Sequence, residues 1–360
     1  MLSDNVLILV REINRKFGAD TVVMGSDMAI PGRFPTGSLS LDVALGGGWP
    51  ANQWAEIIGL ESAGKTMCAL KTIAANQAAD PDYATFWLAA ERYDEQQATA
   101  LGVDNSRVMV SPRQDMETAL DLVVKVTASK AVTCIVLDSY PALIPEAEAE
   151  GSVGDIHVAP GARLMNKFLR QLGAASRRDV RGSEPAFHGI IINQYRDKVG
   201  SYGDPKTTPG GNGKNYFFYA RVEVKRLEYI TEKRPGLADP VKVGQSVRFT
   251  TIKNKSAAPQ QRAKVDYYFR GAPFLGFARG DYDFGKEFVE MGRLFGTIRG
   301  SSWLEYRGQK YHGKAALEAA IRDDFLLREQ LREDVMEAAR NPLMVDQITR
   351  EEYDHAIEDD

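Results

Sequence analysis

The sequence predicts an α/β fold in which a mostly parallel sheet is covered by helices on both faces. Short apolar runs recur along the chain, and helical stretches separate them. These runs occupy residues 54–58, 85–88, 133–137, 189–192, 222–227 and 247–252. A run that is apolar at every position fits a strand buried on both faces, as parallel strands usually are. Ligand sites in such sheets lie at the carboxyl ends of the strands.

The first element that we expect is an amphipathic helix that ends at Gly18. Its apolar side chains fall on one helical stripe, formed by Leu2, Val6, Leu9, Val10, Ile13 and Phe17. A helix detached from the rest of the chain needs a surface to cover such a stripe. The spacing leaves open whether that surface belongs to its own domain or to a neighbouring subunit.

The first apolar run leads into the segment Gly59-Leu60-Glu61-Ser62-Ala63-Gly64-Lys65-Thr66, and a helical pattern follows. G-x-x-x-x-G-K-T between a strand and a helix is typical of a loop that cradles phosphates with backbone N–H groups. In such loops the lysine reaches the β- and γ-oxygens and the Thr hydroxyl ligates Mg²⁺. The segment therefore predicts binding of ATP or GTP with Mg²⁺.

Two acids follow later strands of the same sheet. Asp138 comes directly after the run 133–137, where a carboxylate can hold Mg²⁺ together with Thr66. Glu91 lies just beyond the run 85–88 and is the candidate to activate an attacking water. A carboxylate that stabilises a helix N-terminus is the alternative interpretation of Glu91.

A basic, glycine-rich segment follows the run 189–192. It spans residues 193–214 and carries Arg196, Lys198, Lys206 and Lys214. Such a segment is too polar for a core and too long for a simple turn. Gln194 at its start can sense a γ-phosphate, as switch segments do. A surface loop without function is the alternative.

In the region before this segment, positive side chains recur at helical spacing. Arg163, Asn166 and Arg170 share one helix face, which suits the phosphates of a nucleic acid or, alternatively, simple solvation. From residue 160 to 226 there are thirteen Lys or Arg against five Asp or Glu. Lys253 and Lys255 place two ammonium groups on one face of a strand.

The overall composition is that of a soluble protein. The chain has 360 residues, a net charge of −4, two cysteines without C-x-x-C spacing, and no apolar stretch long enough to span a bilayer. We expect a cytoplasmic protein with no membrane contact. Beyond residue 271 the pattern predicts a small α/β region, with a charged helical stretch from about 315 to 340 and an acidic end.

Together these residues resemble the RecA family of homologous-recombination ATPases, which includes bacterial and phage-encoded members. The motifs stand in the family's order, and the resemblance extends to about residue 340. They comprise residues 36–42, 59–66, 136–139, 150–157, 192–194, 207–212 and 253–259. The resemblance implies a RecA-type P-loop NTPase core with an N-terminal polymerisation helix and a small C-terminal α/β domain.

The resemblance also implies a function in DNA recombination and repair. Family members form helical filaments on single-stranded DNA with ATP and Mg²⁺, pair it with homologous double-stranded DNA and exchange strands. The implied divisions are residues 1–34 for docking, 35–270 for the ATPase core, 271–345 for the small domain and 346–360 for the acidic tail. A ring helicase or translocase, and a DNA-coating filament that barely hydrolyses ATP, are alternatives.

Individual roles follow by position. Glu91, Lys65 and Gln194 are the implied catalytic residues. Nucleotide-binding positions are Gly59, Glu61, Ser62, Ala63, Gly64, Lys65, Thr66, Asp94 and Asp138, with Lys253 and Lys255 reaching a neighbour's phosphate. DNA-binding positions are Val158, Arg163, Asn166, Arg170, Arg196, Val199, Gly210 and Gly211. Phe218 matches an aromatic that packs into the next subunit.

Two departures from the family pattern bear on the structure. The family's adenine-stacking Tyr aligns with Gln97, which leaves either Tyr93 or no residue to stack on the adenine. Residues 177–185 are an insertion.

Overall fold

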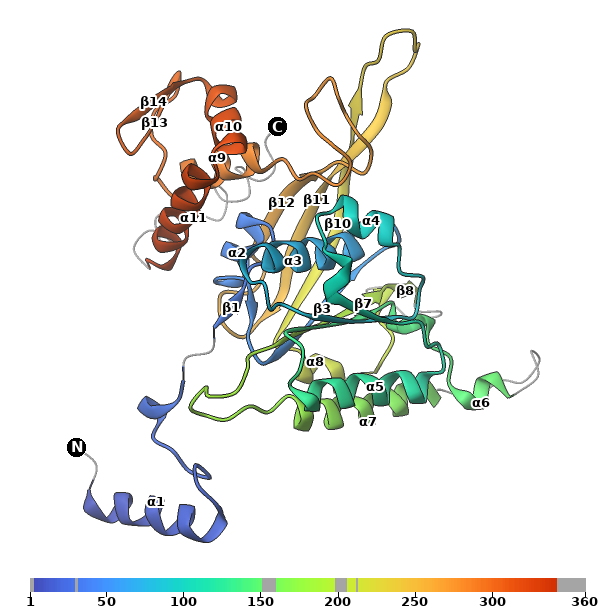
Figure 1. Ribbon diagram of the computed structural model, residues 1–360, viewed down its shortest axis with the longest axis vertical. Coiled ribbons are helices and arrows are strands. Elements are labelled where there is room, and N and C mark those ends of the chain that lie inside the picture. Colours follow the sequence, from blue (N-terminus) through green and yellow to red (C-terminus); the bar gives the residue numbers. More distant parts are fainter. Residues whose placement is uncertain (1–2, 30–31, 151–159, 198–205, 212, 342–360) are drawn as a thin grey trace.

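The computed structural model describes residues 3–29, 32–150, 160–197, 206–211 and 213–341. Its centre is an eight-stranded sheet in the order β12-β11-β10-β3-β7-β6-β4-β5 (Figure 1). The strands are β3 (Gln53–Gly59), β4 (Thr85–Ala89), β5 (Val108–Ser111), β6 (Cys134–Asp138), β7 (His188–Gln194), β10 (Ala220–Glu232), β11 (Val241–Asn254) and β12 (Arg262–Tyr267). The pairings from β10 to β5 are parallel, and those of β11 are antiparallel. The predicted fold class is confirmed.

Helices cover both faces of this sheet. One face carries α2 (Leu39–Leu45), α3 (Lys65–Ala79) and α4 (Glu95–Ala100), and the other carries α5 (Met116–Ser129), α7 (Pro160–Ala175) and α8 (Gly213–Phe217) (Figure 1). Alternate residues of β3 serve the two layers, because Ile57 joins the cluster of Ile73 whereas Trp54 joins that of Phe168. Burying each such side chain contributes about 1.5–3 kcal/mol.

Shorter elements complete the core. They are β1 (Arg33–Phe34), β2 (Trp49–Pro50), α6 (Glu146–Ala149), β8 (Arg196–Asp197), β9 (Lys206–Thr207) and the 3₁₀ turns Gly25–Asp27, Asn105–Arg107 and Tyr140–Ala142. β1 pairs with β2, and β8 pairs with β9. The second pair joins the two ends of the basic segment that follows β7.

The register of the parallel strands brings their carboxyl ends to one edge. Gly59 of β3 lies opposite Gln194 of β7, and Ala89 of β4 lies opposite Asp138 of β6. Because β6 also pairs with β7, the residues that follow these four strands emerge side by side. The edge predicted to hold the site is therefore continuous.

A C-terminal lobe packs beside α2. It contains α9 (Phe284–Leu294), β13 (Trp303–Tyr306), β14 (Gln309–His312), α10 (Lys314–Asp323) and α11 (Phe325–Arg340). The sequence had suggested one helical stretch from about 315 to 340, but the structure divides it at Asp324. That carboxylate accepts hydrogen bonds from the N–H groups of Leu326 and Leu327, so it caps a new helix and does not continue the old one.

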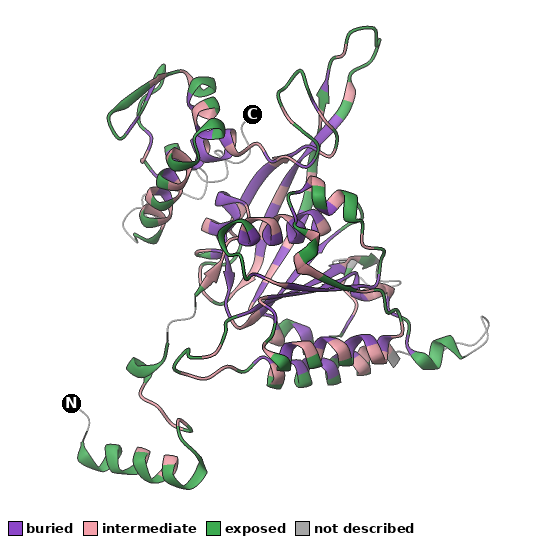
Figure 2. Cartoon of the chain, viewed as in Figure 1, coloured by how far each residue is buried: buried purple, intermediate pink, exposed green. Residues whose placement is uncertain are grey.

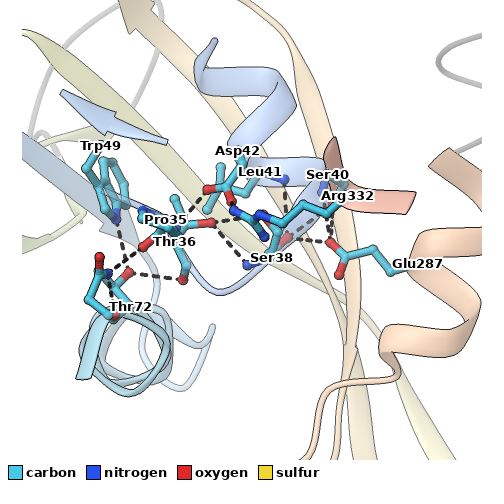
Figure 3. A network of polar contacts seen from close by, with 11 residues as sticks. Pro35, Thr36, Ser38, Ser40, Leu41, Asp42, Trp49, Thr72, Glu287 and Arg332 are labelled. Carbon is cyan, nitrogen blue, oxygen red and sulfur yellow. Dashed lines mark hydrogen bonds and ion pairs between the residues drawn. The ribbon is translucent and has the colours of Figure 1, made fainter. Parts of the chain in front are cut away.

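Buried acids fasten this lobe to the core (Figure 3). Glu287 of α9 accepts hydrogen bonds from the hydroxyls of Ser38 and Ser40 at 2.5 and 2.7 Å. Arg332 of α11 pairs with Asp42 of α2, whose side chain is fully buried. Burial raises the pKa of Glu287, whereas the serine hydrogen bonds oppose that rise. Leu39 of α2 also belongs to the apolar cluster of the lobe.

The N-terminal helix α1 (Asp4–Phe17) lies apart from the sheet, and none of its residues is buried (Figure 2). Leu9 is 54% exposed and Phe17 is 66% exposed. The segment 177–185 contacts the chain that follows this helix. Arg181 binds Asp20 at 2.9 and 2.7 Å, and the N–H of Ala29 donates to the carbonyl of Val180. The described core therefore does not cover the apolar stripe.

His188 begins β7 as a buried, neutral group. Its Nε2 lies 2.6 Å from the hydroxyl of Tyr83, and its ring is 4.6 Å from that of Phe34. Burial lowers the pKa of His188 from 6.5 to about 3. The folded chain therefore cannot take up the proton that the unfolded chain binds below pH 6.5.

We predict that His188 makes the fold acid-sensitive. Between pH 6.5 and 3 this residue alone should lower the free energy of unfolding by up to about 1.4 kcal/mol per pH unit, because only the unfolded state gains the proton. Urea denaturation at pH 7 and at pH 5 should show a smaller loss in His188→Gln than in the wild type. His312→Gln, which removes an exposed histidine, is the control. Equal losses in wild type and His188→Gln would contradict the prediction.

Candidate functional site

Two glycines of the loop after β3 have positions that other residues would not fit. Gly59 lies so close to β10 that a Cβ would be 2.4 Å from the carbonyl oxygen of Val224. Gly64 has φ +106°, a conformation that strains side chains with a Cβ. The loop can therefore turn sharply against the sheet and point its N–H groups at one place, as a phosphate cradle requires.

Lys65 lies inside this turn. Its side chain is largely buried, and Nζ donates to the carbonyl oxygen of Leu60 at 2.7 Å. Burial lowers the pKa of Lys65, whereas the nearby carboxylates of Glu91, Asp138 and Glu61 oppose that shift. A cation held among acids, with few contacts to water, can bind a phosphate strongly.

The acids lie at the predicted edge. Thr66 Oγ1 donates to Asp138 Oδ1 at 3.5 Å, and Gln194 Nε2 donates to Glu91 Oε1 at 3.2 Å. Burial raises the pKa of Asp138 to about 7, and the charge of Glu91 adds to the rise. A buried carboxylate without a full set of positive partners favours a bound cation, and hydroxyl and carboxylate oxygens suit Mg²⁺.

These residues line one cavity of about 650 Å³. The sequence-predicted Glu61, Ser62, Gly64, Lys65, Thr66, Glu91, Asp138 and Gln194 all contribute to its wall. Gly59 and Ala63 support the loop from the core side, where both are buried. The cavity is large enough for a small-molecule ligand.

The far wall of the cavity was not foreseen from sequence. It consists of Arg226, Tyr229, Gln245, Tyr267 and Phe269. Gln245 of β11 lies opposite Tyr229 of β10 and also opposite Tyr267 of β12, so the three side chains form one row on one face. Arg226 lies 4.6 Å from the centre of the Tyr229 ring. Only the pairing of distant strands creates this row.

Asp94 and Tyr93, which the sequence offers as candidates near the nucleotide, make contacts within their own part of the chain. Asp94 caps α4 by accepting a hydrogen bond from the N–H of Gln97 at 2.9 Å, and it is not among the described residues that line the cavity. Tyr93 packs edge to face on Trp87 and donates to Asn105 Oδ1 at 2.6 Å. Gln97 does line the cavity. Contacts with Trp87 and Asn105 therefore fix the position of the Tyr93 ring.

The predicted DNA-facing helix α7 is amphipathic as expected. Arg163, Asn166 and Arg170 are exposed, whereas Phe168 and Leu172 of the same helix are buried. The basic face is therefore available to a ligand.

The other positions predicted to contact the DNA backbone are Gly210, Gly211 and Arg196, and they lie at the ends of the basic segment. A Cβ on Gly211 would be 3.6 Å from the amide nitrogen of Asn166, so Gly211 lies beside α7. Gly210 has φ +106° and is buried. Arg196 is exposed and donates to the carbonyl of Pro141 at 3.3 Å.

The paired lysines lie away from the phosphate loop of their own chain. Lys253 pairs in register with Arg221, and β11 then continues away from the edge where Gly59 ends β3. Lys253 Nζ donates to the carbonyls of Asn215 and Phe218, both at 2.6 Å. Lys255 is exposed, with Nζ 5.8 Å from the ring of Tyr219.

Phe218, which the resemblance places against the next subunit, is buried within its own chain. Its ring is 1% exposed and belongs to the cluster that contains Trp54 and Phe187. Phe218 lies between the short helix α8 and strand β10. This position places its side chain in the apolar layer under β3. Tyr216, in the same helix, is 82% exposed.

Three predictions fall on other parts of the chain. Val158, Val199 and the acidic tail 346–360 lie outside the described residues.

Comparison with known proteins agrees with the geometry. A family described as RecA N-terminal domain matches residues 5–272. Protein RecA of Frankia casuarinae is 36% identical over 340 residues, which cover 93% of this chain and 91% of the relative. The chain belongs to the RecA family. Protein RecA of Mesomycoplasma hyopneumoniae is 34% identical, covering 91% of this chain and 92% of the relative. That of Oceanobacillus iheyensis is 39% identical over 264 residues, 72% of each chain.

Membership of the RecA family makes this a DNA recombination and repair protein. In general terms the family implies nucleotide binding with Mg²⁺ and an ATPase that depends on DNA. Within the described ranges, none of the helices combines the length and apolarity that a bilayer span needs.

Proposed function

We propose that this chain couples ATP hydrolysis to DNA strand exchange as a helical filament on single-stranded DNA. The observation that carries the proposal is the hydrogen bond between Gln194 and Glu91 inside the cavity. It joins the candidate catalytic carboxylate to Gln194, which lies at the start of the basic segment 193–214. A ligand that meets one of these side chains therefore affects the other.

ATP would bind with its phosphates in the loop 59–66. Lys65 neutralises the β- and γ-phosphates, and Thr66 with Asp138 would hold Mg²⁺. When bound, Mg²⁺ would neutralise the negative charge that develops on the phosphates during transfer. Glu91 orients the attacking water and accepts its proton. The exposed carboxylate is free to do so once Gln194 turns to the γ-phosphate.

The wall beyond the loop suits the base of the nucleotide. Tyr229 is 39% exposed and Phe269 is half-buried, so both can offer part of a ring to a flat ligand. Their rings meet edge to face at 6.4 Å. Aromatic stacking of this kind contributes about 0.5–1.5 kcal/mol. Tyr229 and Phe269 would take the place of the family's adenine-stacking Tyr, whose position is occupied by Gln97 in this chain.

DNA would lie along α7 and the ends of the basic segment. Arg163, Asn166 and Arg170 present donors on one face, and Arg196 lies beyond them. Gly210 and Gly211 would let a phosphate approach the backbone closely. Val158 and Val199 are proposed to separate groups of bases. These contacts involve the DNA backbone, so the binding would tolerate any sequence.

Filament formation would use surfaces that the chain does not cover itself. The apolar stripe of α1 would dock on a neighbouring core, and residues 1–34 would serve this purpose. Lys253 and Lys255 would reach the phosphates held by the next subunit, because β11 runs away from their own loop. Residues 35–270 would form the ATPase core and 271–345 the small domain, with an acidic tail at 346–360.

The proposal is tested by ATP turnover and strand exchange. We expect single-stranded DNA to stimulate ATP hydrolysis and homologous duplex to exchange a strand with it. Lys65→Ala should abolish both, because the phosphates lose their buried cation. Electron microscopy with a non-hydrolysable analogue separates an open filament from the ring of a helicase. Exchange that persists in Lys65→Ala would disprove the site, and turnover near zero in wild type would favour a DNA-coating protein.

Arg170→Ala should weaken binding of single-stranded DNA to the same extent for different sequences. Loss of one phosphate contact should reduce the slope of log affinity against log salt by about 0.7. Fluorescence anisotropy with several oligonucleotides over a salt series measures both effects. Lys125→Ala, on the exposed side of α5, is the matched control. A loss confined to some sequences would contradict a backbone contact.

Tyr229→Ala should weaken ATP binding by about two- to tenfold, because the base loses an aromatic contact. Binding of inorganic tripolyphosphate should not change, since this ligand has no base. Calorimetric titration with both ligands measures the difference. Tyr93→Phe keeps its ring on Trp87 and should bind ATP as the wild type does. Equal losses for ATP and tripolyphosphate would assign Tyr229 to the phosphates.

A further inference from the structure

A cluster of buried charges lies under the site and has no part in the chemistry described so far. Glu56, in the middle of β3, is fully buried. Arg221 of β10 donates to its Oε2 at 2.6 Å, and Lys214 of α8 lies 3.9 Å from its Oε1. Removing charges from water is costly unless partners surround them, so such a cluster calls for a specific explanation.

Lys214 uses its ammonium group on the backbone of its own chain. Nζ donates to the carbonyls of Thr208 and Pro209 at 2.6 and 2.7 Å, and also to the Thr208 hydroxyl. The residue is 4% exposed. An ammonium group has three donors, so these contacts leave none for DNA. The sequence had suggested a loop cation, but the structure gives Lys214 a structural role.

Asn193 reaches the same place from the other end of the basic segment. Its amide donates to Glu56 Oε1 at 2.7 Å and to the carbonyl of Pro209 at 3.2 Å. Asn193 directly precedes Gln194, the residue that contacts Glu91. The two ends of the segment therefore converge on one carboxylate. That carboxylate stands on the strand that leads into the phosphate loop.

We infer that Lys214, Asn193 and Glu56 form a clasp that fixes the two ends of the DNA-binding segment to strand β3. Lys214 acts in it as a positioning residue, since its donors bind Thr208 and Pro209 of its own chain. The clasp makes the two ends move together, so that a change at Gln194 also reaches residues 207–211. This inference rests on the proposed function for its purpose, but the contacts themselves do not.

The inference differs from a purely stabilising role. Removing one partner of a buried ion pair is costly when it leaves the other charge alone, but Arg221 and Asn193 still contact Glu56 when Lys214 is replaced. Lys214→Met keeps the length and most of the volume but removes the donors to Thr208 and Pro209. If the clasp couples the two ends, this change should free both of them, including the end that Lys214 does not touch.

Hydrogen exchange of the protein without ligands tests the coupling directly. In Lys214→Met we expect faster exchange at residues 207–211 and also at 193–196. Asn193→Ala, made from the opposite end, should in turn loosen residues 207–211. Lys310→Met removes an exposed lysine of β14 and serves as the control. Faster exchange confined to the mutated end in both variants would overturn the inference.

A second measurement tests the consequence for function. DNA stimulation of ATP turnover should fall by about tenfold or more in Lys214→Met, which is within the usual range of coupling between sites. Affinity for ATP without DNA should stay as in wild type. Normal stimulation would also overturn the clasp. If the wild type itself shows no stimulation, the proposed function fails, and the exchange data still decide whether the clasp exists.

Discussion

Register between parallel strands is the constraint on which this site depends. Gln194 lies at the cavity because β7 pairs with β3 so that it stands opposite Gly59, and Asp138 stands opposite Ala89 in the same way. A slip of one residue would turn Gln194 to the other face of the sheet. Two apolar layers prevent that slip, since Trp54 and Ile57 would exchange environments. Packing in the core thus determines the geometry of the catalytic edge.

Buried carboxylates join parts of the chain that are distant in sequence. Glu56 binds Asn193, 137 residues away, and Glu287 binds Ser38 across 249 residues. Each acid would be unfavourable alone, because a charge without partners is costly in a region of low polarity. With several donors it specifies one arrangement of its neighbours, which the apolar contacts around it would tolerate less strictly. The lobe and the basic segment are attached by the same physical means.

Features that depend on neighbouring residues could be predicted from sequence, whereas features that depend on distant pairing could not. The phosphate loop, Asp138 and Gln194 follow apolar runs, so their place at the sheet edge was predictable. The row of Tyr229, Gln245 and Tyr267 arises only when three strands pair. Lys214 was counted among the cations of the basic segment because a lysine in such a sequence suits a surface, and only the packing under β3 gives it a core position. The helix cap at Asp324 was not predicted, because many other charged residues surround it in the sequence.

The contacts of Lys253 have an energetic consequence for any anion that approaches it. Its ammonium group already donates to the carbonyl of Asn215 in α8 and to that of Phe218 just beyond it, so a phosphate can recruit it only by breaking those hydrogen bonds. Part of the attraction is then used to fray the end of this short helix. Because Lys214 belongs to the same helix, capture of an anion by Lys253 would also loosen the contacts that Lys214 makes with Thr208 and Pro209.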